Sequence, residues 1–260
     1  MKLLLIGLTL AVLAAGCARS NDAPAAPTQA LPTSTAPAPT PTQTQSRNQP
    51  TSNTPTGTAS ACPNKSLEDC FSYTQMSSFL DAVEPMVAQY FQSQFPKLPS
   101  PNNVVYIPHG RAAASRCGGA SNSLAYEYCP ADQRIFIGQD LLWAFYNQAG
   151  DAAPVIALAH EWGHHIQNWM DVPFPRTAAE SVNYENQADC VAGSFADYAG
   201  GQGWLESDDL DDVETLLANI GSDGAGRDHG NAAERAAAFQ LGYESGIKGC
   251  NSFSPNAKLA

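Results

Sequence analysis

Apolar residues recur at helical spacing along several stretches of this chain. In 79–95, for example, Leu80, Val83, Val87 and Tyr90 fall on one side of a helix. Similar patterns predict further helices over 141–148, 152–170, 179–198, 210–220 and 232–246. Shorter runs at 104–107, 125–128 and 134–137 favour strands, the last two pairing across a turn at 130–132. The pattern therefore predicts an α+β fold, mainly helical, with a small antiparallel sheet ahead of the helix at 152–170.

The first residues differ from the rest of the chain. Lys2 precedes an apolar run at 3–13, and small residues lead to Cys17. A charged start, a short apolar run and small residues are typical of a secretory signal peptide. Cys17 directly after Ala-Ala-Gly resembles the lipobox of bacterial lipoproteins, which implies cleavage before Cys17 and its acylation. The alternative is a plain signal peptide with an incidental cysteine.

A low-complexity segment follows the signal. Residues 18–60 contain eight prolines among Thr, Ser, Ala and Gln, with almost no apolar bulk. Such a segment buries too little surface to offset the entropy of ordering it, so we expect an extended tether. The predicted organisation is a signal peptide at 1–16, a lipidated cysteine and tether at 17–60, and one domain at 61–260. We expect the protein to be exported and lipid-anchored to the extracytoplasmic face of a bacterial membrane.

The charge balance is acidic. The chain has 13 basic and 25 acidic residues, a net charge of −12 with neutral histidines. Nucleic acid is therefore not an expected partner. One acidic run begins the predicted helix near 210, and we interpret it as a solvated helix start, with a calcium site or a patch for basic substrates as alternatives. The run comprises Glu206, Asp208, Asp209, Asp211, Asp212 and Glu214.

Cysteine usage agrees with export. Seven cysteines less Cys17 leave six, an even number that suggests disulfides, although six cysteines allow fifteen pairings. The pairing we expect is Cys62–Cys70, Cys117–Cys129 and Cys190–Cys250. A competing interpretation makes Cys190 a metal ligand, but it lies about 100° round a helix from the carboxylates considered below.

The most informative motif is His160-Glu161-Trp162-Gly163-His164 within the apolar helix. Residues four apart share one helix face, so His160 and His164 can bind one ion. Glu161 would lie beside the ion, where a general base acts on metal-activated water. The alternative is a core helix with a polar edge.

The next predicted helix supplies a third ligand. Glu185 and Asp189 are four residues apart, so both carboxylates point the same way. Catalytic zinc takes three protein ligands, and His₂Glu is one recurring set. We expect Glu185 to be the ligand and Asp189 to accept the outer N–H of a zinc histidine, His160 in our assignment. Exchanged roles for the two carboxylates, or an acidic solvated helix face, are the alternatives.

Four ordered motifs, within about residues 104–253, resemble the bacterial neutral zinc metallopeptidase family. They are Cys117-Gly118 with Tyr128-Cys129-Pro130-Ala131-Asp132; His160 to Gln167; Glu185 to Gly193; and His229-Gly230 followed by Arg235, Phe239 and 242–246. The helical pair also resembles the wider gluzincin pattern. The resemblance implies a zincin-like metallopeptidase domain with Glu185 as zinc ligand and Asp189 as its supporting residue.

Three further histidines need an interpretation. His229 precedes the last predicted helix, where it could stabilise the oxyanion of a zinc peptidase reaction or serve only in local turn chemistry. His165 points off the ligand face, so we expect a structural role, and His109 lies in a turn where a structural or surface role is expected.

The predicted activity is that of a zinc-dependent endopeptidase with one Zn²⁺ per chain. Zinc would lower the pKa of water toward about 7, and Glu161 would take the proton and return it to the leaving amine. The expected partners are a peptide or protein substrate from the envelope or outside the cell, and a membrane through the lipid anchor. Two rivals remain: a zinc amidase acting on cell-wall peptide, and a non-catalytic zinc-binding envelope module.

Overall fold

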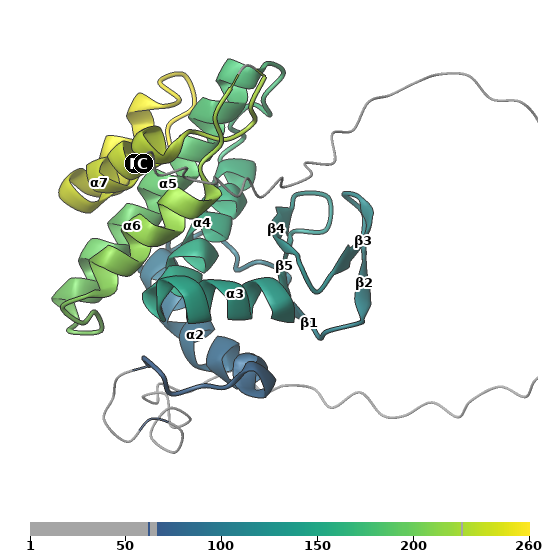
Figure 1. Ribbon diagram of the computed structural model, residues 1–260. Coiled ribbons are helices and arrows are strands. Elements are labelled where there is room, and N and C mark those ends of the chain that lie inside the picture. The colour runs from purple at the N-terminus through teal and green to yellow at the C-terminus, as the bar shows by residue number, and fades with distance from the viewer. Residues whose placement is uncertain (1–61, 63–66, 225) are drawn as a thin grey trace, which may run out of the picture. The chain divides into compact units, whose positions relative to one another are not determined.

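A computed structural model describes residues 62, 67–224 and 226–260 of the chain (Figure 1). Its helices are α2 (Met76–Gln94), α3 (Gln139–Ala149), α4 (Ala152–Trp169), α5 (Ala178–Gly201), α6 (Asp209–Ile220) and α7 (Ala232–Gly249). Two short 3-10 turns are η1 (Tyr73–Gln75) and η2 (Cys250–Ser252). The strands are β1 (Asn103–Ile107), β2 (Ala112–Ser115), β3 (Gly119–Asn122), β4 (Tyr126–Cys129) and β5 (Arg134–Gly138).

The expected fold class, mainly helical α+β, is confirmed, and each predicted helix is present. The predicted β4–β5 hairpin also forms, with Tyr128 opposite Ile135. One expectation about the sheet is wrong. β1 pairs with β5 in parallel, so the three-stranded sheet β1-β5-β4 is mixed rather than antiparallel. Between β1 and β5 the chain forms β2, β3 and β4 and returns to the end of the sheet at which β1 began. β1 and β5 therefore run in the same direction.

A separate two-stranded sheet, β2–β3, was not predicted from the sequence. Its register pairs Ala112 with Asn122 and Ser115 with Gly119. The strands consist mostly of Ala, Ser, Gly and Asn, which carry no alternation of large apolar and polar side chains. The two strands therefore pair through their backbones and the turn between them. Their sequences lack the alternation of apolar and polar residues that would have predicted them.

Helix α4 is the centre of the molecule and is buried along almost its whole length. It contacts α2, α3, α5, α6 and the edge strand β4. Trp162 on this helix is 1% exposed and stacks on Phe91 of α2, with ring centroids 5.4 Å apart. A helix packed against neighbours along most of its length holds its polar side chains in fixed positions, because the neighbouring side chains restrict their rotamers.

Glycines allow α5 to approach both of its neighbours closely. A Cβ at Gly163 of α4 would lie 2.9 Å from the Cα of Ala188 on α5. On the other side of α5, a Cβ at Gly242 of α7 would lie 1.7 Å from the carbonyl oxygen of Cys190. Larger residues at either position would push the helices apart, so these contacts set how far α5 and α7 are from α4.

Three disulfides join the expected pairs of cysteines. Cys62–Cys70 and Cys117–Cys129 close local loops of 8 and 12 residues, and Cys190–Cys250 links α5 to η2 across 60 residues. Because the sulfur of Cys190 is bonded to Cys250, it is not available as a metal ligand.

The predicted signal peptide, the lipidation site Cys17 and the tether lie outside the described residues. No helix in the described part of the chain is long and apolar enough to cross a membrane.

Candidate metal centre

The two histidines of the H-E-x-x-H motif and one glutamate converge between α4 and α5. His160 and His164 share a face of α4, with ring centroids 4.7 Å apart. The Oε2 atom of Glu185 on α5 lies 3.2 Å from Nε2 of His160 and 3.5 Å from Nε2 of His164. One potential ligand atom from each of the three residues lies within 4.8 Å of the others. The close α4–α5 packing at Gly163 thus places the third residue opposite the motif.

Asp189 holds the far side of His160. Its Oδ1 atom lies 2.8 Å from Nδ1 of His160, so Nδ1–H donates to this carboxylate and Nε2 is left as the atom that faces Glu185. The same oxygen accepts a hydrogen bond from Nη2 of Arg235 on α7, also at 2.8 Å. Asp189 and Arg235 are each 3% exposed at their side chains. A carboxylate behind a ligating histidine fixes the tautomer and orientation of the ring.

A chain of amides performs the same task for His164. Nδ1 of His164 lies 2.8 Å from Oε1 of Gln167, whose Nε2 donates to the carbonyl oxygen of Tyr184 and to Oε1 of Gln187. Gln187 in turn donates to the carbonyl oxygen of Cys250. Because backbone carbonyls only accept, the direction of each bond is determined, and Nδ1 of His164 must be the donor. Its Nε2 atom is therefore free to act as a ligand.

With both histidines neutral, this arrangement brings three acceptors together without a donor. Both Nε2 atoms present lone pairs, and Oε2 of Glu185 is buried with no hydrogen-bond partner in the described part of the chain. Burying an unpaired carboxylate oxygen is costly unless a cation offsets its charge. Two imidazole nitrogens and one carboxylate oxygen are the ligand types that zinc takes in open catalytic sites. The residues present therefore fit a zinc ion.

The charges of these groups shift the pKa values of one another. Burial alone would lower the pKa of His160, but Asp189 and Glu185 raise it above its usual value. Burial would raise the pKa of Glu185, but the two histidines lower it well below its ordinary range. The carboxylates of Asp189 and Glu185 thus favour positive charge at this position, which a bound cation would supply.

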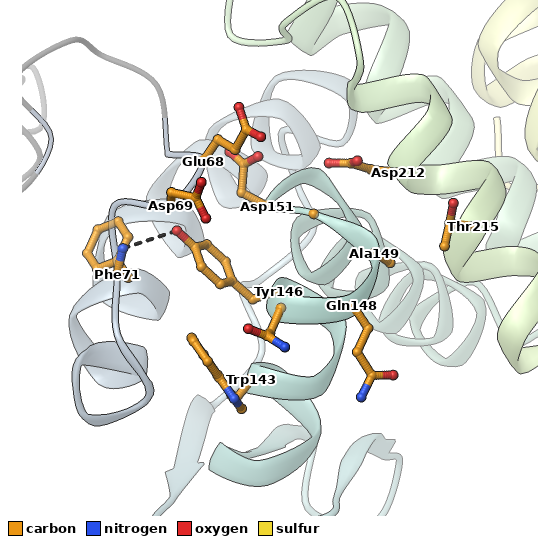
Figure 2. Close-up of a pocket in the computed structure, with 12 residues that line it drawn as sticks. Glu68, Asp69, Phe71, Trp143, Tyr146, Gln148, Ala149, Asp151, Asp212 and Thr215 are labelled. Atoms are coloured by element: carbon orange, nitrogen blue, oxygen red, sulfur yellow. Dashed lines mark hydrogen bonds between the residues drawn. The ribbon is translucent and has the colours of Figure 1, made fainter.

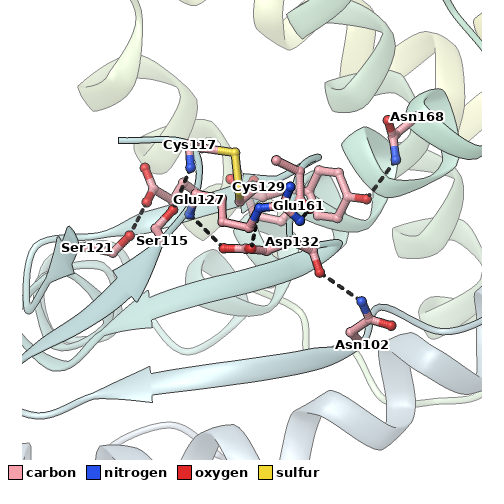
Figure 3. Close-up of a disulfide and its surroundings, with 12 residues drawn as sticks. Asn102, Ser115, Cys117, Ser121, Glu127, Cys129, Asp132, Glu161 and Asn168 are labelled. Atoms are coloured by element: carbon pink, nitrogen blue, oxygen red, sulfur yellow. Dashed lines mark hydrogen bonds and ion pairs between the residues drawn. A yellow bond between two sulfur atoms is a disulfide. The ribbon is translucent and has the colours of Figure 1, made fainter. Parts of the chain in front are cut away.

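Glu161 lies next to this group without belonging to it. It is 7% exposed, and its Oε2 atom accepts a hydrogen bond of 2.7 Å from the backbone N–H of Tyr128 in β4. Burial raises the pKa of Glu161, while His160 and His164 oppose the shift. Figure 3 shows Glu161 beside β4 and the disulfide that joins Cys117 to Cys129. The edge strand of the sheet and the carboxylate beside the metal ligands are thus in direct contact.

His229 also reaches the centre from the segment before α7. Its Nε2 atom lies 3.4 Å from Oε2 of Glu185, and its Nδ1 atom lies 3.0 Å from Oδ1 of Asp228. Its side chain is 41% exposed, in contrast to the two motif histidines. Asn231, two residues on, caps α7 by accepting from the N–H of Glu234, and this fixes where the preceding turn ends. His229 thus borders the open side of the group.

The two remaining histidines lie away from the metal ligands. His165 is 1% exposed and contacts the carbonyl oxygen of Pro99 and the hydroxyl of Tyr128. His109 is exposed and pairs with Asp140, at 2.9 Å.

Asp189 lies behind His160 as the sequence predicted, but the other residues that support the candidate ligands were not assigned this role from the sequence. Gln167 lies three positions after His164 on the same helix, a spacing that could have suggested the contact. Gln187 and Arg235 carried no comparable signal, because their partners Gln167 and Asp189 are distant in sequence. Asp228 carried none either, because it contacts its neighbour His229, for which the sequence left two roles open.

The acidic run is less solvated than its sequence suggested. Asp208 and Asp211 are exposed, but Asp209 is 4% exposed and lies with Asp151 and Glu206 in a group whose carboxylate oxygens are within 4.8 Å of one another. Asp151 borders a pocket of about 510 Å³, which Figure 2 shows lined also by Glu68, Asp69 and Asp212. Burial and the charges of Asp209, Glu206 and Asp212 raise the pKa of Asp151 to about 7.

Comparison with known proteins agrees with this site. Residues 38–253 match the family described as "Putative neutral zinc metallopeptidase", and the chain belongs to this family. It is 32% identical to the uncharacterized protein YpfJ of Escherichia coli strain K12 over 226 residues, 75% of each chain. It is 33% identical to the uncharacterized protein Rv2575 of Mycobacterium tuberculosis strain H37Rv over 183 residues, 56% of this chain and 62% of the relative. The chain therefore covers less than two thirds of the mycobacterial protein's length. No solved structure matches the chain.

Proposed function

We propose that this protein is a zinc-dependent endopeptidase that hydrolyses peptide bonds in envelope or extracellular proteins. The observation that carries the proposal is the convergence of His160, His164 and Glu185 beside the carboxylate of Glu161. A purely structural zinc site needs no base and usually has four protein ligands. Three ligands with an adjacent carboxylate are the arrangement expected for hydrolysis.

His160, His164 and Glu185 would hold the ion. Zinc bound there supplies Lewis acidity, which lowers the pKa of water to about 7 and polarises a carbonyl. Glu161 then acts as the general base: it takes a proton from the attacking water and returns it to the nitrogen of the leaving amine. The hydrogen bond from the N–H of Tyr128 holds one carboxylate oxygen of Glu161, so the other oxygen is the one that accepts the proton.

His229 is the second residue to which we assign a role in the reaction. A donor on the open side of the centre can stabilise the oxyanion of the tetrahedral intermediate. Nδ1 of His229 lies 3.0 Å from Oδ1 of Asp228, and its Nε2 atom faces Oε2 of Glu185 at 3.4 Å. In its imidazolium form His229 has an N–H at both ring nitrogens, so it can donate to Asp228 through Nδ1 and to the oxyanion through Nε2. Replacing His229 with Ala should leave zinc in place and reduce hydrolysis by about 10- to 1,000-fold.

The edge strand β4 gives the substrate a place to bind. A peptide in extended conformation can add to an exposed sheet edge through main-chain hydrogen bonds. β4 is at one edge of the three-stranded sheet, and its Tyr128 contacts Glu161. A peptide along β4 would therefore run past the general base.

We further propose that the chain is exported and anchored by an acylated Cys17 outside a bacterial membrane. This location would make proteins of the envelope its substrates. A zinc amidase acting on cell-wall peptide uses the same metal and base, and only the substrate separates it from an endopeptidase.

Metal removal and substrate profiling together test the proposal. A chelator should abolish cleavage of a broad peptide library by the purified full chain, and about one equivalent of zinc per chain should restore it. Envelope peptides from cells with the wild-type protein should include cleavage products missing from cells with Glu161→Gln. The endopeptidase would be ruled out if cells with wild type and cells with Glu161→Gln yield the same envelope peptides and the zinc-loaded wild type cleaves no peptide of the library. Products confined to cell-wall peptides would identify the amidase.

A further inference from the structure

We propose that Tyr184 and Phe174 form one wall of a substrate subsite that accepts a large apolar or aromatic side chain beside the metal centre. The inference rests on the proposed peptidase function and adds a substrate preference to it. Neither residue belongs to the metal ligands, and neither was assigned a role from the sequence.

Tyr184 connects the subsite to the metal centre. Its ring stacks on the ring of His164, with centroids 5.3 Å apart and planes inclined by 13°. Its carbonyl oxygen accepts from Gln167, the same residue that holds Nδ1 of His164. Two independent contacts thus fix the position of this aromatic ring relative to a metal ligand. A rigid wall costs little entropy on binding, because no side chain has to be ordered.

Phe174 continues this wall outward. Its ring centroid lies 6.0 Å from that of Tyr184. It is 71% exposed, the largest exposure among the large hydrophobic side chains that the structure places at the surface. Pro173 and Pro175 flank it, and each proline fixes its own φ, which limits the freedom of the segment. An aromatic side chain held on a stiff segment and left exposed is suited to contact with a ligand.

Tyr184 and Phe174 both line a cavity of about 250 Å³. Its lining also includes Phe253 and Pro255 from the segment after η2, together with polar residues such as Arg176, Glu180 and Asn183. That segment follows Cys250, which is joined to α5 by a disulfide and accepts a hydrogen bond from Gln187. The cavity is smaller than the roughly 300–1,000 Å³ of pockets for drug-sized ligands. Its size suits a single side chain of a peptide.

The distances place this cavity within reach of a peptide at the metal. Phe174 is at most about 11 Å from the ring of His164, since the two ring-to-ring steps are 5.3 and 6.0 Å. An extended peptide advances about 3.3 Å per residue. The side chain that contacts Phe174 therefore belongs to a residue within about three positions of the bond that is cut. Aromatic and apolar walls select apolar side chains, because those lose contact with water on entering.

The test compares the zinc-loaded wild-type chain with Phe174→Ala on a hexapeptide library carrying Phe, Leu or Ala at each position. We expect the wild type to favour Phe or Leu over Ala at one position near the cut. In Phe174→Ala that preference should fall by roughly 10- to 100-fold in kcat/KM, because activity on the Phe and Leu peptides falls by more than activity on the Ala peptide. Leu210→Ala removes another exposed apolar side chain, on α6, and should leave the preference intact.

Three results would overturn the subsite: the same preference in wild type and Phe174→Ala, no apolar preference in the wild type, or loss of zinc from Phe174→Ala. A change in oligomeric state of Phe174→Ala would instead assign the patch to contacts between copies of the chain. Calorimetric binding of the best Phe hexapeptide and its Ala twin to zinc-loaded Glu161→Gln separates this inference from the proposed function. The subsite is supported if Glu161→Gln binds the Phe peptide more tightly than its Ala twin and the double variant Glu161→Gln, Phe174→Ala binds the two equally. This result would stand even if the wild type cleaves nothing. Equal binding of the two peptides to Glu161→Gln would exclude the subsite.

Discussion

The guanidinium of Arg235 on α7 and the carboxylate of Asp189 on α5 form a buried ion pair, and Asp189 uses the same oxygen to hold His160. Both distances are 2.8 Å. A residue of α7 thereby reaches, through Asp189 of α5, the back of a candidate metal ligand on α4. Arg235 is a positioning residue in this arrangement, since it touches neither the ligand group nor a reacting atom but holds the carboxylate that orients His160.

Arg235→Met should therefore weaken zinc binding by about 10- to 100-fold, the usual effect of losing support behind a ligand. It should also lower the free energy of unfolding by about 3–5 kcal/mol, because the charge of Asp189 is left buried without its partner. Arg235→Lys should fall between Arg235→Met and wild type, because it keeps the charge and loses the planar fork. Chelator competition measures the zinc affinity, and urea unfolding the stability.

Arg227→Ala is the matched control, because Arg227 pairs with Glu234 near the surface at the start of α7. It should leave both the stability and the zinc affinity close to their wild-type values, because solvent screens an ion pair at the surface. Wild-type zinc affinity in folded Arg235→Met would remove Arg235 from the support of the metal centre.

The two carboxylates of α5 should differ in their effects on zinc. Glu185→Ala removes the atom that both motif histidines face and should abolish stoichiometric zinc binding. Asp189→Ala removes the support behind His160 and should weaken binding only, by about 10- to 100-fold. Metal analysis after dialysis distinguishes the two. Retained zinc in Glu185→Ala with loss in Asp189→Ala would show that the roles are exchanged.

Local patterns were enough to predict the helices and the ligand group, and long-range contacts explain what could not be predicted. His160 and His164 are four residues apart on one helix, as are Glu185 and Asp189, so spacing alone aligned each pair. The parallel pairing of β1 with β5 depends on where the chain returns after 26 intervening residues, 108–133. The contact of Arg235 with Asp189 spans 46 residues and depends on the approach of α7 to α5 at Gly242.

The same limit applies to the acidic residues. The run at 206–214 reads as a solvated helix start, and residues such as Asp211 are exposed as expected. Asp151, however, is far from the run in sequence, and only the packing of α6 against the start of α4 brings the two together. Burial of like charges across two helices is a tertiary feature that no single segment encodes.

Asp151 should make the protein less stable as the pH rises. Its pKa is about 7 in the folded state against an ordinary value of 3.8. Between these values the folded state holds a proton that the unfolded state has released, so the free energy of unfolding falls with rising pH. Asp151→Asn keeps the neutral form at every pH. Its melting temperature should exceed that of wild type by at least about 4 °C at pH 8, and the difference should vanish near pH 4.

The exposed neighbour Asp211 provides the control for this experiment. Asp211→Asn removes one charge from the same acidic region without removing a buried one, so its effect on the melting temperature should be small at both pH values. Scanning calorimetry in buffer without added divalent cations measures all three proteins. An equal gain in both variants would attribute the effect to net charge, and a gain for Asp151→Asn that persists at pH 4 would contradict the raised pKa.

Location is tested at Cys17. If the chain is a lipoprotein, Cys17→Ser should release soluble domain or leave unprocessed precursor, while the wild type stays with the membrane fraction. Intact mass should show acyl chains on the wild type alone. The same membrane extraction behaviour in both proteins, with no lipid on either, would contradict the anchor and leave the metal centre unaffected.

The central claim is that Glu161 is the base of a zinc peptidase. Glu161→Gln removes the proton acceptor, and its remaining carbonyl oxygen can still accept the hydrogen bond from Tyr128. The decisive measurement is the rate of peptide hydrolysis by zinc-loaded wild type and Glu161→Gln, with zinc content and melting temperature determined on the same samples. We predict equal zinc, a similar melting temperature and a rate at least about 100-fold lower in Glu161→Gln. Equal rates in two proteins that both carry zinc would contradict the assignment of Glu161 as the base.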